Sequence, residues 1–143
     1  MKKSDLVSVV IVSFNRKKEL IECLDSCLKS TYSNLEIILV DNASKLPIVS
    51  WLPKKYSKVK LVTNDINYGA AEGRNIGLKQ TKGKYVLFMD DDATMDRGMI
   101  SSLVKSFETK KKAGVIQPLI IDKKNKNQKM GFNTITAEYS SYI

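Results

Sequence analysis

A short apolar run that stops at three consecutive carboxylates is the feature that most constrains the fold. The run covers residues 85–89, and Asp90, Asp91 and Asp92, here called the acidic triplet, follow it directly. Such a run is typical of a strand covered on both faces, as in a parallel sheet, and ligands of open α/β sheets bind beyond the carboxyl ends of such strands. If the backbone stays extended, Asp90 and Asp92 share one face and Asp91 points the opposite way. Two interpretations remain open: a site for a hard cation, Mg²⁺ or Mn²⁺, or an acidic loop that caps the next helix.

The rest of the chain alternates strand patterns with helix patterns. Apolar and β-branched runs predict strands, and 3.6-residue apolar spacing predicts helices. Strands are expected at residues 6–12, 35–40, 59–63, 85–89 and 115–121, and helices at residues 16–30, from about 69 onward, and at 97–111. Asn15 and Asp96 are predicted N-caps, and Gly83 and Gly114 are predicted to close helices. The pattern predicts an α/β fold, a mainly parallel sheet flanked by helices, in a single domain covering residues 1–143.

Glycine loops that bind phosphates are excluded by the sequence. A dinucleotide fold needs G-x-G-x-x-G after its first strand, but residues 13–18 contain no glycine. A P-loop ending at Gly83 and Lys84 is also excluded, because Leu78 stands where its first glycine would be. If phosphates bind here, we expect a metal ion to hold them.

Three glycines lie four residues apart, at Gly69, Gly73 and Gly77. In a helix they would form one flat face, against which another backbone or a ligand could lie closely. Each glycine costs a helix about 1 kcal/mol relative to alanine, so their presence indicates a packing or a ligand reason.

Composition narrows the classes of function. The formal charge of +9 favours anionic partners, but only three of the 24 basic residues are arginines, and the lysine clusters have little aromatic interleaving, which argues against nucleic acid. We interpret the lysines as a solvated surface and keep peripheral membrane contact open. The chain has no histidine, which excludes the commonest general base, and Cys23 and Cys27 are interpreted as reduced core cysteines. Without an apolar stretch near 18 residues, a cytoplasmic protein is expected, which could act at the inner face of the membrane.

Four stretches, taken in order, resemble the family 2 glycosyltransferases, nucleotide-sugar transferases with the GT-A fold. They are residues 7–16, 38–44, 67–77 and 88–92, and the resemblance extends from about residue 6 to residue 121. It implies a Rossmann-like GT-A nucleotide-diphospho-sugar transferase fold, here incomplete. The third stretch resembles the branch that contains rhamnosyl- and galactofuranosyltransferase-like enzymes.

The resemblance also implies which residues bind the donor. The implied substrate-binding residues are Val12, Ser13, Phe14, Asn15, Arg16, Asp41, Asn67, Gly69, Arg74, Asn75, Asp90 and Asp91. Among them Asp41 would read a base N–H. Asp92, together with Asp90, would bind Mg²⁺ or Mn²⁺ that bridges to the diphosphate, while Asp91 or Asp90 would reach the ribose or the sugar. For Arg74 two roles remain open: a positive charge near the diphosphate, or a salt bridge to one of the aspartates.

The implied reaction is metal-dependent transfer of a sugar, with inversion, from a UDP- or dTDP-linked donor to a hydroxyl of a glycan or a lipid-linked acceptor. Inverting members use a carboxylate base from a later motif. The acids after the triplet, Asp96, Glu108, Asp122 and Glu138, do not stand in that context. We therefore expect the base and the acceptor-binding half beyond Ile143, and this chain alone is not expected to catalyse transfer. The alternative is a non-catalytic module that binds a nucleoside diphosphate and a metal. The sequence leaves the oligomeric state open.

Overall fold

The computed structural model describes residues 4–121 and 129–130. The chain forms two compact units, Met1–Arg97 and Gly98–Ile143, and each is described by itself. The expectation that residues 1–143 make one domain stays a prediction.

The first unit is built on a four-stranded parallel sheet with the order β3-β2-β1-β4. Its strands are β1 (Val7–Ser13), β2 (Leu35–Asp41), β3 (Lys60–Thr63) and β4 (Tyr85–Asp90). Two short 3₁₀ helices, η1 (Ile48–Ser50) and η2 (Lys54–Tyr56), connect β2 to β3. The central strands β1 and β2 are almost entirely buried, which explains their continuous β-branched sequences. The four strands predicted up to residue 90 are confirmed.

The register brings the carboxyl ends of the strands to one edge of the sheet. Ser13 at the end of β1 lies beside Asp41 at the end of β2, and Val12 lies beside Asp90 at the end of β4. From β1 the chain continues to β2 on one side, whereas β4 is added on the other side. The strand order therefore reverses between β1 and β4, and such switch points are where open α/β sheets bind ligands.

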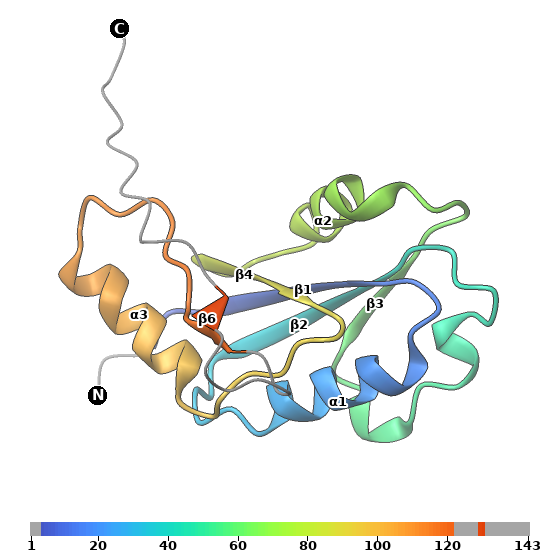
Figure 1. Ribbon diagram of the computed structural model, residues 1–143, viewed down its shortest axis with the longest axis horizontal. Helices are drawn as coiled ribbons and strands as arrows, with labels where there is room; N and C mark the ends of the chain where they lie inside the picture. The colour runs from blue at the N-terminus through green and yellow to red at the C-terminus, as the bar shows by residue number, and fades with distance from the viewer. Residues whose placement is uncertain (1–3, 122–128, 131–143) are drawn as a thin grey trace, which may run out of the picture. The chain divides into compact units, whose positions relative to one another are not determined.

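Helix α1 (Lys17–Leu28) covers one face of the sheet and helix α2 (Gly69–Leu78) covers the other (Figure 1). The buried residues of α1 are Leu20, Cys23, Leu24 and Cys27, a stripe at helical spacing. Both cysteines are free and buried, which confirms their assignment to the core.

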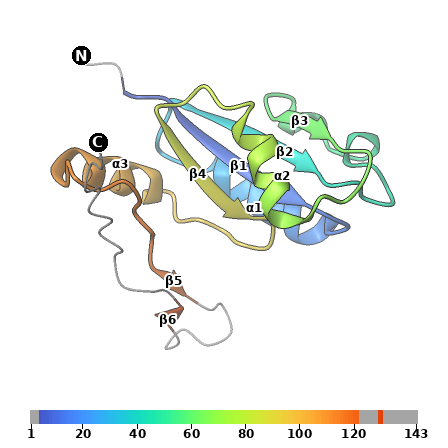
Figure 2. The same cartoon turned by 90° about the horizontal axis from the view of Figure 1, so that it is seen from above.

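Helix α2 lies directly on β1 and β2, as Figure 2 shows from above. A Cβ atom at Gly73 would stand 2.7 Å from Val12 Cγ1, and one at Gly77 would overlap Val10 Cγ1. Close packing of α2 on β1 therefore explains why glycine stands at both positions. Gly69 has open space around it but a φ of +77°, a backbone conformation that glycine adopts without strain.

Two predictions about the ends of these helices are wrong. The N-cap position of α1 is Arg16, not Asn15, and no side chain caps the helix; Asn15 has a φ of 59° and serves the preceding loop. Helix α2 ends at Leu78, so Gly83 does not close it. Instead, Gly83 lies so near β1 that a Cβ there would approach the backbone nitrogen of Ser8 to 2.7 Å.

The second unit contains α3 (Met99–Thr109) and a separate antiparallel pair, β5 (Ile120–Ile121) and β6 (Lys129–Met130). A helix is confirmed here, but it begins after Gly98 without a side-chain cap and ends at Thr109, so the capping roles predicted for Asp96 and Gly114 are wrong. The predicted fifth strand of the parallel sheet is also wrong. Only two of its residues are extended, and Pro118, which has no N–H for a ladder, precedes them.

None of the helices in the part of the chain that the structure describes is long and apolar enough to cross a membrane.

Candidate functional site

A pocket of about 420 Å³ lies at the carboxyl edge of the sheet in the first unit. This size is within the range of small-molecule sites. Four segments line it: the end of β1 with its loop, the residue after β2, the start of α2 with the loop before it, and the end of β4. The lining residues are Val12, Ser13, Phe14, Arg16, Asn42, Asn67, Gly69, Ala70, Arg74, Met89, Asp90, Asp91 and Asp92.

The acidic triplet has one buried and two exposed carboxylates. Asp91 is buried and accepts a hydrogen bond from Ser13 Oγ at 2.7 Å. Asp90 and Asp92 are exposed, but the backbone does not stay extended: β4 ends at Asp90, and residues 91 and 92 form a turn in which the Ala93 N–H donates to the Asp90 carbonyl at 3.1 Å. The strand end therefore presents two carboxylates to solvent and fixes the third against β1.

Each exposed carboxylate is paired with an arginine. Arg74 Nη2 donates to Asp90 Oδ1 at 2.6 Å, and Arg16 Nη1 donates to Asp92 Oδ2. Arg16 Nη1 also lies 4.0 Å from Asp91 Oδ1. The hydrogen bond to Asp92, aided by the charge of Asp91, raises the pKa of Arg16 above its usual value. Of the two roles left open for Arg74, the structure shows the salt bridge.

Burial changes the pKa of the middle carboxyl, Asp91. Loss of solvent raises the pKa of Asp91 above its ordinary value, and the neighbouring negative charges of Asp92 and Asp90 act in the same direction. The Ser13 hydrogen bond and the Arg16 charge oppose the shift without cancelling it. Asp91 is therefore harder to ionise than an aspartate in water, and a cation bound close to it would oppose this shift.

Asn42 organises the loop before α2. Its amide nitrogen donates to Asn67 Oδ1 at 2.7 Å and to the Gly69 carbonyl at 3.2 Å. Its amide oxygen accepts from Asn64 Nδ2 at 2.9 Å and from the Tyr68 N–H at 3.2 Å. A single buried side chain thus ties the end of β2 to the start of α2. Sequence reasoning missed it, although a short polar residue directly after a predicted central strand was the available signal.

Asp41 does not line the pocket. Its carboxylate is fully buried and accepts the N–H of Ser44 at 2.9 Å and the N–H of Ile48 at 2.8 Å. These bonds hold the turn after β2, where Ala43 has the left-handed φ of 66° that non-glycine residues rarely adopt. The placement gives Asp41 a structural task and does not support the expected contact with a base.

Two other expected binding residues also lie outside the pocket lining. Asn15 Oδ1 accepts the Lys45 N–H at 2.8 Å, so its side chain joins two loops. Asn75 Nδ2 donates to Glu72 Oε2 at 3.0 Å on the exposed side of α2. The remaining residues predicted to bind the donor do line the pocket, together with Asn42, Ala70 and Met89, which were not predicted.

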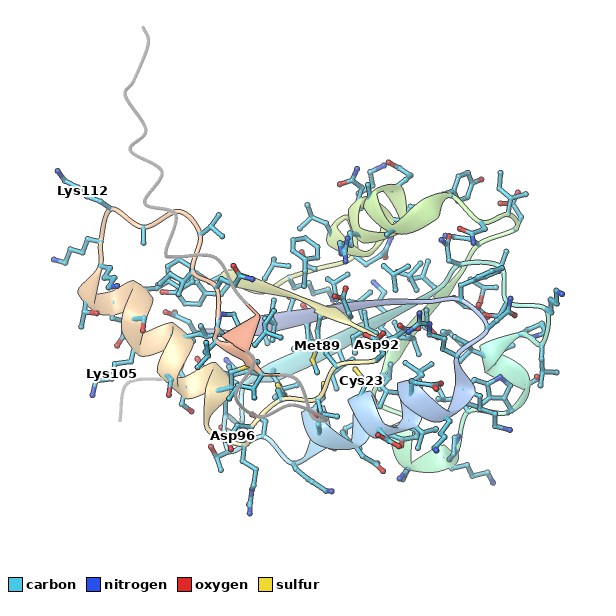
Figure 3. The ribbon with its side chains drawn as sticks, viewed as in Figure 1. Cys23, Met89, Asp92, Asp96, Lys105 and Lys112 are labelled. Carbon is cyan, nitrogen blue, oxygen red and sulfur yellow. The ribbon has the colours of Figure 1, made fainter. Side chains whose placement is uncertain are left out.

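Sulfur-containing side chains of α1 and β4 support the triplet. Figure 3 shows Cys23 and Met89 close together near Asp92, between the end of β4 and α1. Cys23 Sγ donates to the Asp90 carbonyl at 3.5 Å, and Cys27 Sγ lies 3.8 Å from Met89 Sδ. The hydrogen bond between Cys23 and Cys27, together with burial, raises the pKa of Cys23, so the Cys23 thiol stays protonated. We interpret the pair as packing groups under the site.

Within residues 4–121 and 129–130, no three His, Cys, Asp or Glu side chains are grouped so that they could hold a metal ion by themselves. The pocket offers two exposed carboxylates instead. Mg²⁺ is often bound by one or two carboxylates together with phosphate oxygens of a substrate, so this donor set fits a cation that arrives with a diphosphate.

These features define an α/β domain with an acidic ligand pocket at its switch point. Comparison with known proteins identifies the family: the model of glycosyl transferase family 2 matches residues 8–140, and the chain belongs to this family. The family predicted from the four stretches is thus confirmed.

Curated relatives carry the same assignment. Glycosyltransferase GlyG of Streptococcus pneumoniae is 34% identical over 110 residues, which are 75% of this chain and 36% of GlyG. The Escherichia coli protein named UDP-Glc:alpha-D-GlcNAc-diphosphoundecaprenol beta-1,3-glucosyltransferase WfaP is 35% identical over 108 residues, 75% of this chain and 43% of WfaP. The chain therefore spans less than half the length of these two relatives.

Solved structures confirm the predicted GT-A fold. Staphylococcus aureus TarS 1-349 in complex with UDP-GlcNAc has a TM-score of 0.66 and 26% identity, covering 72% of this chain and 31% of that one. A mannosyltransferase of Pyrobaculum calidifontis, solved with GDP-Man and Mn²⁺, has a TM-score of 0.67 and 24% identity, covering 74% of this chain and 33% of that one. At that identity the second similarity shows the fold alone.

Proposed function

We propose that the protein to which this chain belongs transfers a sugar from a nucleoside diphosphate sugar to an acceptor hydroxyl, and that this chain binds the donor. The observation that carries the proposal is the pocket itself. It brings two arginines, a helix start and three carboxylates from distant parts of the sequence to the switch point of a GT-A sheet. Family membership supports this assignment.

The chain offers separate groups for each part of the donor. The exposed ring of Phe14 gives the base a surface on which to stack. The diphosphate is attracted by Arg16 and Arg74 and by the amino end of α2, where Gly69 and Ala70 line the pocket. Asp91 or Asp90 would reach a hydroxyl group of the ribose or the sugar, and the hydrogen bond from Ser13 Oγ holds the Asp91 carboxylate in place at the pocket.

A divalent cation, Mg²⁺ or Mn²⁺, is the proposed cofactor, held by Asp92 with Asp90 as the second carboxylate. When bound, it would neutralise charge on the diphosphate as this becomes the leaving group. The two exposed carboxylates of the pocket support the assignment, because they supply the oxygen ligands that a cation shared with phosphates requires.

The finer features of the reaction are proposals by analogy with the family and its relatives. UDP is the first nucleotide to test, since TarS was solved with UDP-GlcNAc and WfaP is named for a UDP-Glc donor. The name of WfaP also suggests a lipid-linked acceptor. Inversion requires a carboxylate base, which we propose lies in the part of the relatives that this chain does not cover.

Calorimetry tests the donor site. We expect UDP to bind the 143-residue chain at least tenfold more tightly with Mn²⁺ than without it, and Asp92→Asn to lose this gain. Asp5→Asn is the matched control, since it also removes a negative charge from an exposed ion pair, here with Lys84 at 2.7 Å, before β1 and β4 begin. If UDP, dTDP and GDP all fail to bind with and without Mn²⁺, the proposal is wrong. Donor binding by a full-length protein that transfers no sugar would favour the alternative, a non-catalytic binding module.

A further inference from the structure

The carboxylates proposed to hold a cation are already occupied by the protein's own cations. The side-chain pairs Arg16–Asp92 and Arg74–Asp90, here called the arginine pairs, flank Asp91 on both sides. We propose that Arg16 and Arg74 are internal counter-ions: they block the exposed carboxylates against a free divalent cation and release them when a diphosphate enters. This inference rests on the proposed function and adds an order of binding to it.

Charge balance explains why the pairs form. Three adjacent carboxylates at one strand end repel one another, and Asp91 cannot move out to water because it is buried and bonded to Ser13 Oγ. The two guanidinium groups offset two of the three negative charges. A divalent cation that arrives alone must displace at least one guanidinium and is repelled by it at close range.

The geometry allows the arginines to change partners. The Arg16 side chain is 50% exposed and that of Arg74 is 40% exposed, and both residues line the pocket. A guanidinium binds phosphate and carboxylate oxygens with the same planar pair of N–H donors. A diphosphate in the pocket therefore offers each arginine a second anionic partner within reach of its present one.

The two arginines come from separate elements of the first unit. Arg74 lies on α2 between Gly73 and Gly77, the two glycines packed against β1. Arg16 precedes α1 and follows Asn15, whose φ of 59° shows that the loop leaves regular geometry there. Each pair can thus open by rotation of one long side chain, without movement of the sheet.

Cooperative binding follows from this exchange. The diphosphate draws the guanidinium groups away and frees Asp90 and Asp92 for the cation, and the cation in turn leaves the guanidinium groups free for the diphosphate. By linkage, each ligand raises the affinity of the other by the same factor. Direct coordination of the cation by the diphosphate also couples the two ligands, so the part of the coupling that is lost when the arginines are removed measures their role as counter-ions.

The test measures binding of Mn²⁺ without nucleotide, from the electron paramagnetic resonance signal of free Mn²⁺. Wild type is compared with Arg16→Gln, Arg74→Gln, the double variant and the charge-matched control Lys84→Gln. We expect Mn²⁺ alone to bind the double variant on the order of tenfold more tightly than wild type, because the repulsion at close range is gone. Each single variant should gain less, and the control should match wild type.

A second titration measures Mn²⁺ in the presence of saturating UDP. Wild type should gain at least tenfold in Mn²⁺ affinity from UDP, whereas the double variant should gain much less, because its carboxylates are already free. Arg16→Lys and Arg74→Lys keep the charge and should stay close to wild type. Circular dichroism and thermal unfolding confirm that every variant is folded.

The two hypotheses fail in different ways. If wild type binds none of UDP, dTDP and GDP, with or without Mn²⁺, the proposed function is wrong. If wild type binds UDP with Mn²⁺ but the folded double variant binds Mn²⁺ alone no better than wild type, the counter-ion role is wrong and the donor site stands.

Discussion

The two helices that cover the sheet pack against it in opposite ways. Helix α1 contacts its face through large side chains and buries Leu20, Leu24 and two cysteines. The buried residues of α2 are Gly73 and Gly77. Side chains that exclude water supply most of the stability of a fold, whereas glycine contacts allow two backbones to approach closely. The α1 face therefore buries more side chains of its helix, whereas the α2 face, where Ile76 packs against Val10, Ile38 and Val40, also positions the site.

The close approach of α2 has a direct consequence for the pocket. Arg74 lies next to one packed glycine and reaches Asp90 at 2.6 Å, and Gly69 at the start of the helix lines the pocket. Bulkier residues at the glycine positions would hold the helix further from β1 and carry these groups away from the strand ends. The comparison predicts that changes on the α1 face alter stability, while changes on the α2 face also alter ligand binding.

The largest effect is expected from Leu24→Ala on the α1 face. Leu24 is fully buried, so its truncation should lower the free energy of unfolding by about 2–5 kcal/mol, through lost burial and the cavity left behind. Urea unfolding measures this loss. Leu28→Ala is the control, because Leu28 of the same helix is 48% exposed and should change stability little. A large drop in the UDP affinity of the folded Leu24→Ala protein would contradict the prediction that changes on the α1 face alter stability and leave ligand binding unchanged.

Gly77→Ala on the α2 face should cost about 1–3 kcal/mol, because the new methyl group would overlap Val10 and crowd Val40 Cγ2 at 3.2 Å. Unlike Leu24→Ala, it should also weaken UDP binding, as α2 moves off the sheet. Val10→Ala makes room for the methyl group, so adding Gly77→Ala to it should cost less than adding it to wild type. Equal costs in both backgrounds would show that the two residues are not coupled.

Gly69→Ala should cost about 1 kcal/mol, since the left-handed φ of +77° is strained for alanine although the space around it is open. The free energy of UDP binding should weaken by more than the free energy of unfolding falls, because the start of α2 lines the pocket. Calorimetry and urea unfolding of the same protein separate the two effects. If the variant loses stability but binds UDP like wild type, Gly69 does not contribute to UDP binding.

The smallest effect concerns a pH dependence on the α1 face. Hydrogen bonds from Lys55 at 2.6 Å and from Tyr56 at 2.8 Å lower the pKa of Asp25 below its ordinary value. A lowered folded pKa stabilises the fold above the ordinary aspartate pKa, and this contribution is lost as pH falls through the lowered one. Asp25→Asn should therefore be less stable than wild type at pH 7, and the difference should shrink in acid. A difference that is constant from pH 7 to pH 3 would contradict this assignment.

Local patterns predicted the sheet but not the caps. The first four strands follow from continuous apolar runs, and their polar ends indicated which edge would carry the site. The helix ends were predicted less well, because Asn15 and Asp96 look like caps in sequence, whereas α1 and α3 begin after them without any side-chain cap. Residues 115–121 satisfied the apolar pattern of a strand, yet just two of them pair, Ile120 and Ile121, and they pair with β6 (Lys129–Met130) rather than with the parallel sheet.

The site was predicted where a residue's role depends on its position at a strand end. The triplet and Ser13, which stand at strand ends, were expected in the pocket and line it; Arg74 of α2, which the family resemblance indicated, lines it too. Asp41 and Asn42 were the difficult case, because they are adjacent and both polar. Whether the carboxylate or the amide faces the pocket depends on the turn around Ala43, and a turn with positive φ at a non-glycine residue leaves no clear sequence signal.

The most direct test of the central claim, that the carboxyl edge of the sheet binds a nucleoside diphosphate, is an amide NMR titration of the chain with UDP and Mg²⁺. The account predicts shifts concentrated at Ser13, Phe14, Asn67, Gly69 and the acidic triplet, with little change at Ser8 and Gly83 near the opposite edge. Shifts centred on Ser8 and Gly83, or an unchanged spectrum at saturating UDP, would contradict it.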